Sequence, residues 1–166
     1  MKTDEMIALG ALIVAVCSFF LTIYQARLSR KHNQLQVKPY LDLTCVSTLN
    51  EGFKCILKNY GTGPAYIEKI NYYLDGEKYE VLSPDDFKAL LLEVGLENIS
   101  LDIRHCHFHK HSALSSSEQV NLFELTNSAN KPYNHIDIIT CLKRISITVD
   151  YECSYGLKFI SERSGF

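Results

Sequence analysis

The residues best suited to chemistry are four histidines at alternate positions: His105, His107, His109 and His111. In an extended strand alternate residues project on one side, and His-x-His pairs on strands can bind zinc, nickel or copper. No acidic residue or further thiol lies nearby at ligand spacing, so a complete site needs donors from distant segments. The run therefore predicts a metal-sensing surface only if the fold supplies those donors.

The phase of the surrounding strand decides where these histidines lie. The apolar residues of Ile99–Ile103 share the odd positions of the histidines, so an unbroken strand would turn the imidazoles into the core, at a cost without partners. A bulge near Arg104 would instead bury Cys106 and Phe108 and leave the histidines in water. The run is then an exposed edge that discourages strand pairing, or a pH-responsive surface.

Other patterns that carry chemistry are incomplete. The Gly61-Thr62-Gly63 loop lacks the lysine and helix that follow a phosphate-binding loop, so a structural turn is favoured. The serines of 115–117 have no G-x-S-x-G context, and neither an H-E-x-x-H nor a paired-cysteine zinc pattern occurs. The net charge of -2 gives no field that attracts nucleic acid. We therefore expect no enzyme, no required cofactor and no nucleic-acid partner.

A second candidate surface is rich in tyrosine. It comprises Tyr66, Tyr72, Tyr73 and Tyr79. Tyrosine is enriched where proteins contact one another, which predicts an interaction face, but it is also an ordinary strand residue.

An apolar segment at the amino end predicts a membrane anchor. Met6–Tyr24 contains no charged residue and is long enough as a helix to cross a hydrocarbon core of about 30 Å. A cleaved signal peptide is the main alternative, but no small-residue cleavage site follows the segment. More basic residues follow the apolar segment than precede it, and the positive-inside rule therefore places the carboxyl end in the cytoplasm. The basic residues that follow it are Arg27, Arg30, Lys31 and Lys38.

The remaining features of this end concern assembly and compartment. Small residues line one stripe of the helix and favour self-association in lipid: Ala8, Ala11, Ala15, Ser18 and Thr22. Alanine is common in membrane helices, so the stripe can also arise by coincidence. A helical stalk over residues 25–37 should end before Pro39, and residues 1–5 form a tail. The six cysteines show no disulfide spacing, which fits a reducing compartment.

Residues 38–166 predict a mainly β domain. Strands are expected over Tyr40–Val46, around Phe53–Leu57, near Ile103, near Val120 and over Ile145–Tyr151. The phase change after Ile67 predicts a bulge at Glu68 or Lys69, and Asp75-Gly76 predicts a hairpin turn. Seven or eight short strands indicate an antiparallel, immunoglobulin-like β-sandwich.

Two helices are expected inside this domain. Ser83 is a suitable N-cap, Pro84 suits the first helical position and Gly95 suits the end. A second, shorter helix should cover 134–142, with Ile138 and Leu142 facing inward.

Three stretches resemble small bacterial single-pass membrane-anchored proteins with a sandwich domain: Lys38–Leu43, Leu57–Ala65 and Val149–Gly156. The resemblance implies fold and topology. Together with the basic residues after the apolar segment, we expect attachment to the inner membrane with the amino end outside. The leading hypothesis is a non-enzymatic binding module that recruits a protein partner or a second copy at the cytoplasmic face. The alternatives are a ligand-gated membrane effector, for example in defence against phage, and metal sensing through residues 105–111.

Overall fold

The computed structural model describes residues 3–48, 52–96, 101–127 and 134–166. The chain divides into two compact units, one that ends at Gln36 and one that runs from Val37 to Phe166. Each unit is therefore treated by itself.

The first unit is the single helix α1, Thr3–Gln36. The stretch Met6–Gln36 is long and apolar enough to cross a membrane, and none of its most apolar window is buried within the chain. Its large apolar side chains are exposed, from 37% at Ile23 to 68% at Ile7. Such a helix fits a membrane anchor or a signal sequence.

The second unit contains ten strands within its described residues, and every strand pairing is antiparallel. One sheet has the order β1-β2-β7-β5: Leu41–Thr48, Gly52–Asn59, Gln119–Asn127 and Leu101–His105. The other has the order β10-β8-β3-β4: Ser164–Gly165, Ile145–Glu152, Ala65–Leu74 and Glu77–Tyr79. Two further strands extend this second sheet, β6 (Ser112–Leu114) beside β3 and β9 (Lys158–Ile160) beside β8.

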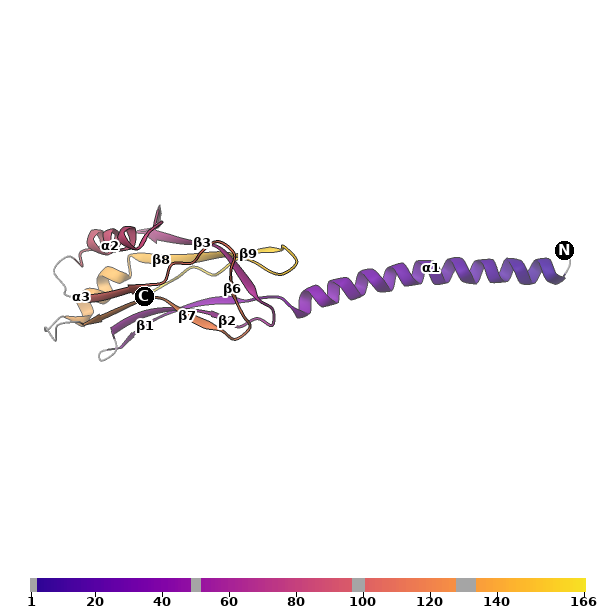
Figure 1. The fold of residues 1–166 in the computed structure, drawn as a ribbon, viewed down its shortest axis with the longest axis horizontal. Coiled ribbons are helices and arrows are strands. Elements are labelled where there is room, and N and C mark those ends of the chain that lie inside the picture. The colour runs from indigo at the N-terminus through magenta and orange to yellow at the C-terminus, as the bar shows by residue number, and fades with distance from the viewer. Residues whose placement is uncertain (1–2, 49–51, 97–100, 128–133) are drawn as a thin grey trace. The chain divides into compact units, whose positions relative to one another are not determined.

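Figure 1 shows the two sheets as two layers of the domain, with α2 (Pro84–Glu93) and α3 (His135–Leu142) at one end of it. A continuous core fills the space between the layers because alternate residues of each strand face inward. Its largest fully buried members include Phe53, Phe87, Phe123 and Leu57. The expected mainly β fold with two short helices is confirmed. The immunoglobulin-like strand arrangement stays a prediction.

Several local predictions are also confirmed. The register of β3 against β8 shifts between Ile67 and Lys69, so Glu68 is the bulged residue. Asp75 and Gly76, with φ of 50° and 95°, form the turn between β3 and β4. Ser83 caps α2 through a reciprocal pair of hydrogen bonds with Asp86. These elements fix the course of β3, which carries much of the candidate site.

The loop 59–63 is built around one buried amide, that of Asn59. Its Oδ1 accepts from the N–H groups of Tyr40 and Gly61 at 3.2 and 2.9 Å. Its Nδ2 donates to the carbonyls of Gly63 and Leu114 at 2.8 and 3.1 Å. We call Asn59, Gly61 and Gly63 the clasp.

The two glycines of the clasp let the backbone of 37–40 lie directly against the loop. A Cβ on Gly61 would come within 2.3 Å of the Tyr40 nitrogen, and one on Gly63 within 1.9 Å of the Val37 carbonyl oxygen. The Gly61-Thr62-Gly63 loop therefore has a structural reason for both glycines, as expected.

Candidate functional site

The histidine run connects the two sheets. Strand β5 of the first sheet ends at His105, and β6 of the second sheet begins at Ser112. Residues 106–111 therefore cross from one layer to the other, beside the bulged part of β3. This crossing and its neighbours on β3 and β8 form the candidate site.

His105 lies on the inner side of β5. The register of β5 against β7 is continuous from Leu101 to His105, so of the two alternatives the unbroken strand is confirmed as far as His105 and the bulge near Arg104 is not found. The imidazole stacks on Phe87 at 4.3 Å between ring centroids, and its Nε2 shares a hydrogen bond with the Tyr72 hydroxyl at 2.9 Å. Ring stacking and this bond offset much of the cost of placing the imidazole inside.

The environment of His105 keeps its ring neutral. Burial lowers the pKa of His105 to about 4, with a smaller contribution from the neighbouring His107. Its Nδ1 is buried and has no hydrogen-bond partner. A neutral imidazole at the base of the site is therefore expected at physiological pH.

This lowered pKa predicts a loss of stability in acid. The unfolded chain binds a proton at His105 near pH 6.5 and the folded chain only near pH 4, so stability falls as the pH drops through that window. Urea unfolding at pH 7 and pH 4.5 should show a smaller acid effect in His105→Gln than in wild type. His109→Gln, at an exposed position that does not contribute to the lowered pKa of His105, is the matched control and should behave as wild type. Equal acid effects in wild type and His105→Gln would contradict the assignment.

Beyond His105 the strand ends and the phase changes. Cys106 and Phe108 are half-buried, whereas His107, His109 and His111 are exposed. This reproduces the outcome expected from a bulge, although the cause is the end of the strand. His107 and His109 meet edge to face at 5.8 Å between centroids, and the four imidazoles do not converge on one point.

A pocket of about 250 Å³ opens between the crossing segment and β3. Its lining is partly apolar and partly polar. The apolar part is formed by Ile67, Ile70, Val81, Leu82 and Phe108, and the polar part includes Glu68, Lys69, His105, His107 and His109. A concave site of this composition can take a small ligand or a side chain of a partner.

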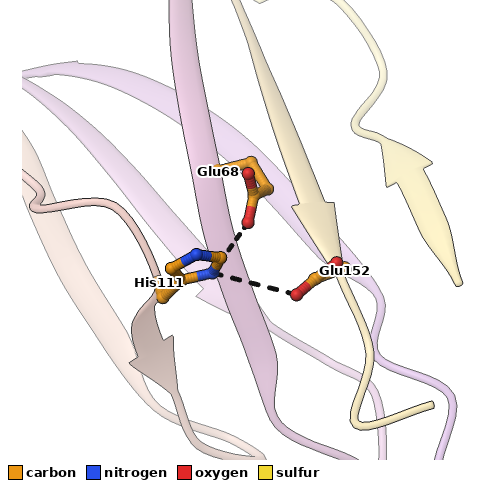
Figure 2. A group of neighbouring side chains, drawn as sticks. All are labelled: Glu68, His111 and Glu152. Carbon is orange, nitrogen blue, oxygen red and sulfur yellow. Dashed lines mark ion pairs between the residues drawn. The ribbon is translucent and has the colours of Figure 1, made fainter. Parts of the chain in front are cut away.

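Next to the pocket, three donor side chains come together on the outer face of the second sheet (Figure 2). The Nδ1 of His111 lies 2.8 Å from Oε1 of Glu68 and 3.8 Å from Oε1 of Glu152. The sequence predicted His111 and the bulge at Glu68, but it did not indicate Glu152. The sequence signal that could have indicated Glu152 was the alternation along β8, in which Tyr151 faces inward and Glu152 faces outward.

The predicted tyrosine face does not form as one surface. Tyr72 is only 2% exposed and belongs to the core, so its inclusion was wrong. Tyr66, Tyr73 and Tyr79 are half-buried, and the guanidinium of Arg163 covers the Tyr73 ring at 4.2 Å. The three remaining tyrosines are partly covered by their neighbours.

Cys45 and Cys55 face each other across β1 and β2, with their sulfurs 2.6 Å apart, and all six cysteines are free. The hydrogen bond from Cys55 lowers the pKa of Cys45, whereas that bond and burial raise the pKa of Cys55.

The paired thiols predict selective alkylation. Cys45 should react first with iodoacetamide, because the thiolate is the nucleophile and the Cys45 thiolate is stabilised by Cys55. Peptide mass spectrometry after a short pulse measures the order of labelling. Cys55→Ser removes one thiol of the pair. Cys153, which is buried elsewhere in the domain, serves as the internal reference for labelling. Faster labelling of Cys55 than of Cys45 in wild type would contradict this.

In α1, the predicted small-residue stripe lies on an exposed helix surface: Ala8, Ala11, Ala15, Ser18 and Thr22. The Thr22 hydroxyl donates to the Ser18 carbonyl at 2.8 Å, so it is satisfied inside its own helix. Any association through the stripe must then rely on close packing more than on this hydroxyl.

The fold and site define a mainly β domain that follows an apolar helix and carries a surface pocket with a mixed apolar and polar lining. Residues 6–164 match the model of a family described as a domain of unknown function (DUF8453), and the chain belongs to that family. No curated protein matches the chain.

Proposed function

We propose that this chain is a membrane-anchored, non-enzymatic binding module that recruits a protein partner or a second copy of itself at the cytoplasmic face of a bacterial inner membrane. The observation that carries the proposal is the pocket beside the sheet crossing. It joins apolar lining residues, which favour burial of a partner group, to imidazoles that can orient it. Recruitment therefore needs no chemical step.

The chemistry of the pocket supports a binding role. Cys106 is the nucleophile closest to its histidines along the chain, but burial raises the pKa of this thiol. A catalytic cysteine requires a lowered pKa, because the thiolate is the reactive form. His105 is held neutral by burial and shares its Nε2 with the core residue Tyr72. Neither group is arranged as an activated nucleophile with its base.

Membrane attachment is supported by the uncovered apolar surface of α1. Side chains such as Phe19 and Phe20 are more than half exposed. Exposed apolar area of this extent is stable in lipid and unfavourable in water. The basic residues that follow the apolar segment ending at Tyr24 support the cytoplasmic orientation through the positive-inside rule.

Crosslinking of the full-length protein in membranes tests the proposal. Wild type should give a defined crosslinked species, either with a partner or with a second copy. Leu82→Arg, at an exposed apolar residue that lines the pocket, should remove a species that depends on the pocket. Leu92→Arg makes the same change at an exposed position of α2 outside the pocket and should leave the species intact. A strictly monomeric wild type that retrieves no partner would refute recruitment.

A parallel pair of variants separates helix association from domain association. Ala15→Leu places a bulky side chain within the small-residue stripe. Val16→Leu adds bulk at the next residue, which lies off the stripe. If the helices pack through the stripe, Ala15→Leu should lower the yield of self-crosslinked protein about fivefold, corresponding to about 1 kcal/mol of lost packing. Equal yields from the two variants would remove the stripe from the interface.

A ligand-gated membrane effector is the second candidate, and the clasp favours it. The first residues of the domain are hydrogen-bonded to the loop 59–63. A rearrangement of that loop would therefore displace the backbone at Tyr40. Expression with and without phage challenge, read by growth and membrane potential, tests this role. A chain that never alters either quantity is not an effector.

A further inference from the structure

Two adjacent strands and the residue before a third each place one metal-ligating side chain on the same outer face. Strand β3 lies between β6 and β8, because it pairs with Ser112–Leu114 on one side and with Ile145–Glu152 on the other. Glu68 is the bulged residue of β3, Glu152 is the last residue of β8, and His111 immediately precedes β6. The three side chains converge in Figure 2 although they are far apart in sequence.

We propose that Glu68, His111 and Glu152 bind one divalent transition-metal ion, with Zn²⁺ the best match. The three ligand atoms lie within 4.8 Å of one another. Zinc bonds to imidazole nitrogen and carboxylate oxygen are about 2.0–2.2 Å long, so two donors at a tetrahedral angle are about 3.4 Å apart. The His111 Nδ1 separations from the two carboxylate oxygens, 2.8 and 3.8 Å, fall on either side of that value.

The backbone holds the imidazole in position for this role. His111 has a φ of +64°, which is unusual for a residue with a side chain, and its N–H donates to the Ile67 carbonyl at 2.9 Å. Ile67 directly precedes the bulged Glu68. The same short stretch of β3 therefore fixes both the imidazole and one carboxylate.

The two oxygens of Glu68 have different surroundings. Its Oε2 lies 3.5 Å from the Lys110 ammonium, while its buried Oε1 faces Nδ1 of His111 at 2.8 Å, a contact that is an ion pair only when the imidazole is protonated and that lacks the geometry of a hydrogen bond. A buried carboxylate oxygen without a hydrogen bond is costly, and a cation bound between the three side chains would satisfy it. Lys110 partly neutralises the second oxygen and leaves Oε1 as the ligand.

The donor set indicates the class of ion. One imidazole and two carboxylates suit Zn²⁺ better than Mg²⁺ or Ca²⁺, which prefer all-oxygen sites. Three protein ligands leave a coordination position for water or for a group of another molecule. A bound ion would also fasten β6 to β8 across β3. The proposal differs from metal binding by the histidine run, because it uses only His111 of that run.

Equilibrium dialysis against Zn²⁺ tests the site in tag-free, full-length protein that has been purified in detergent and stripped with a chelator. Wild type should bind one ion per chain. Glu68→Gln, Glu152→Gln and His111→Ala should each weaken binding at least tenfold. His107→Ala and His109→Ala remove exposed imidazoles of the same run and should bind as wild type.

Co²⁺ provides a second, spectroscopic measurement that reports the coordination of the bound ion. Wild type loaded with Co²⁺ should show the intense visible absorption of a four-coordinate ion, and Glu68→Gln should lose it while its circular dichroism stays unchanged. Wild type that binds no Zn²⁺ overturns the proposal. So does a loss in His107→Ala as large as that in His111→Ala, which would assign the ion to the run. Neither result bears on recruitment, because recruitment is measured by crosslinking in membranes and not by metal binding.

Discussion

Replacing Asn59 with aspartate is expected to destabilise the β domain by about 3 kcal/mol or more. The buried Nδ2 donates to the carbonyls of Gly63 and Leu114, and an aspartate oxygen in its place would face two acceptors without a proton. Each buried polar group that loses its partner costs about 1–3 kcal/mol, and a buried charge adds to that. Pulse proteolysis of the full-length protein in a urea series measures the change.

Asn121→Asp supplies the matched control for this experiment. Asn121 is exposed on β7, so the same chemical change there should alter stability by no more than about 0.5 kcal/mol. Similar urea midpoints for Asn59→Asp and wild type would show that the amide does not hold the loop as described.

The second large effect is expected from Phe87→Ala, which should cost about 3–5 kcal/mol. Phe87 is completely buried on the inner face of α2, with its ring centroid 5.1 Å from Phe123 and 4.3 Å from His105. Removal of the ring leaves a cavity between the helix and the first sheet. The same urea series measures the loss of stability.

Phe87→Ala should also change the titration of His105. Without the phenyl ring, water reaches the imidazole, so the pKa of His105 should rise from about 4 toward its ordinary value. Imidazole NMR signals followed against pH report this shift in the folded variant. Leu92→Ala, on the exposed side of α2, should leave both the stability and the His105 titration close to wild type. An unchanged His105 titration in Phe87→Ala would show that Phe87 does not set its environment.

Much of the fold was predictable because its signals are local. The cap at Ser83 and Pro84 identifies α2, Asp75-Gly76 identifies the turn, and the phase change after Ile67 identifies the bulge. Strands β6 and β10 were missed. They contain only three and two residues, and their pairing depends on a neighbour that is distant in sequence.

The candidate site was predictable only in part, for a related reason. Alternation correctly placed His105 in phase with the inward face, but its stacking partner Phe87 comes from a separate helix. His111 was identified by residue type, whereas its carboxylate neighbours Glu68 and Glu152 become visible only when the order β6-β3-β8 is known. Spacing along one strand cannot reveal donors contributed by three strands.

The clasp also determines how the domain responds to mechanical load. The chain enters at Val37, and its next residues are bonded into the loop 59–63 before β1 begins at Leu41. Strands β1 and β2 are antiparallel and share a long ladder from Leu41 to Thr48. A force applied to the amino end along β1 therefore loads several hydrogen bonds of this ladder in shear at the same time. A ladder loaded in this way resists a larger force than one whose hydrogen bonds open one after another.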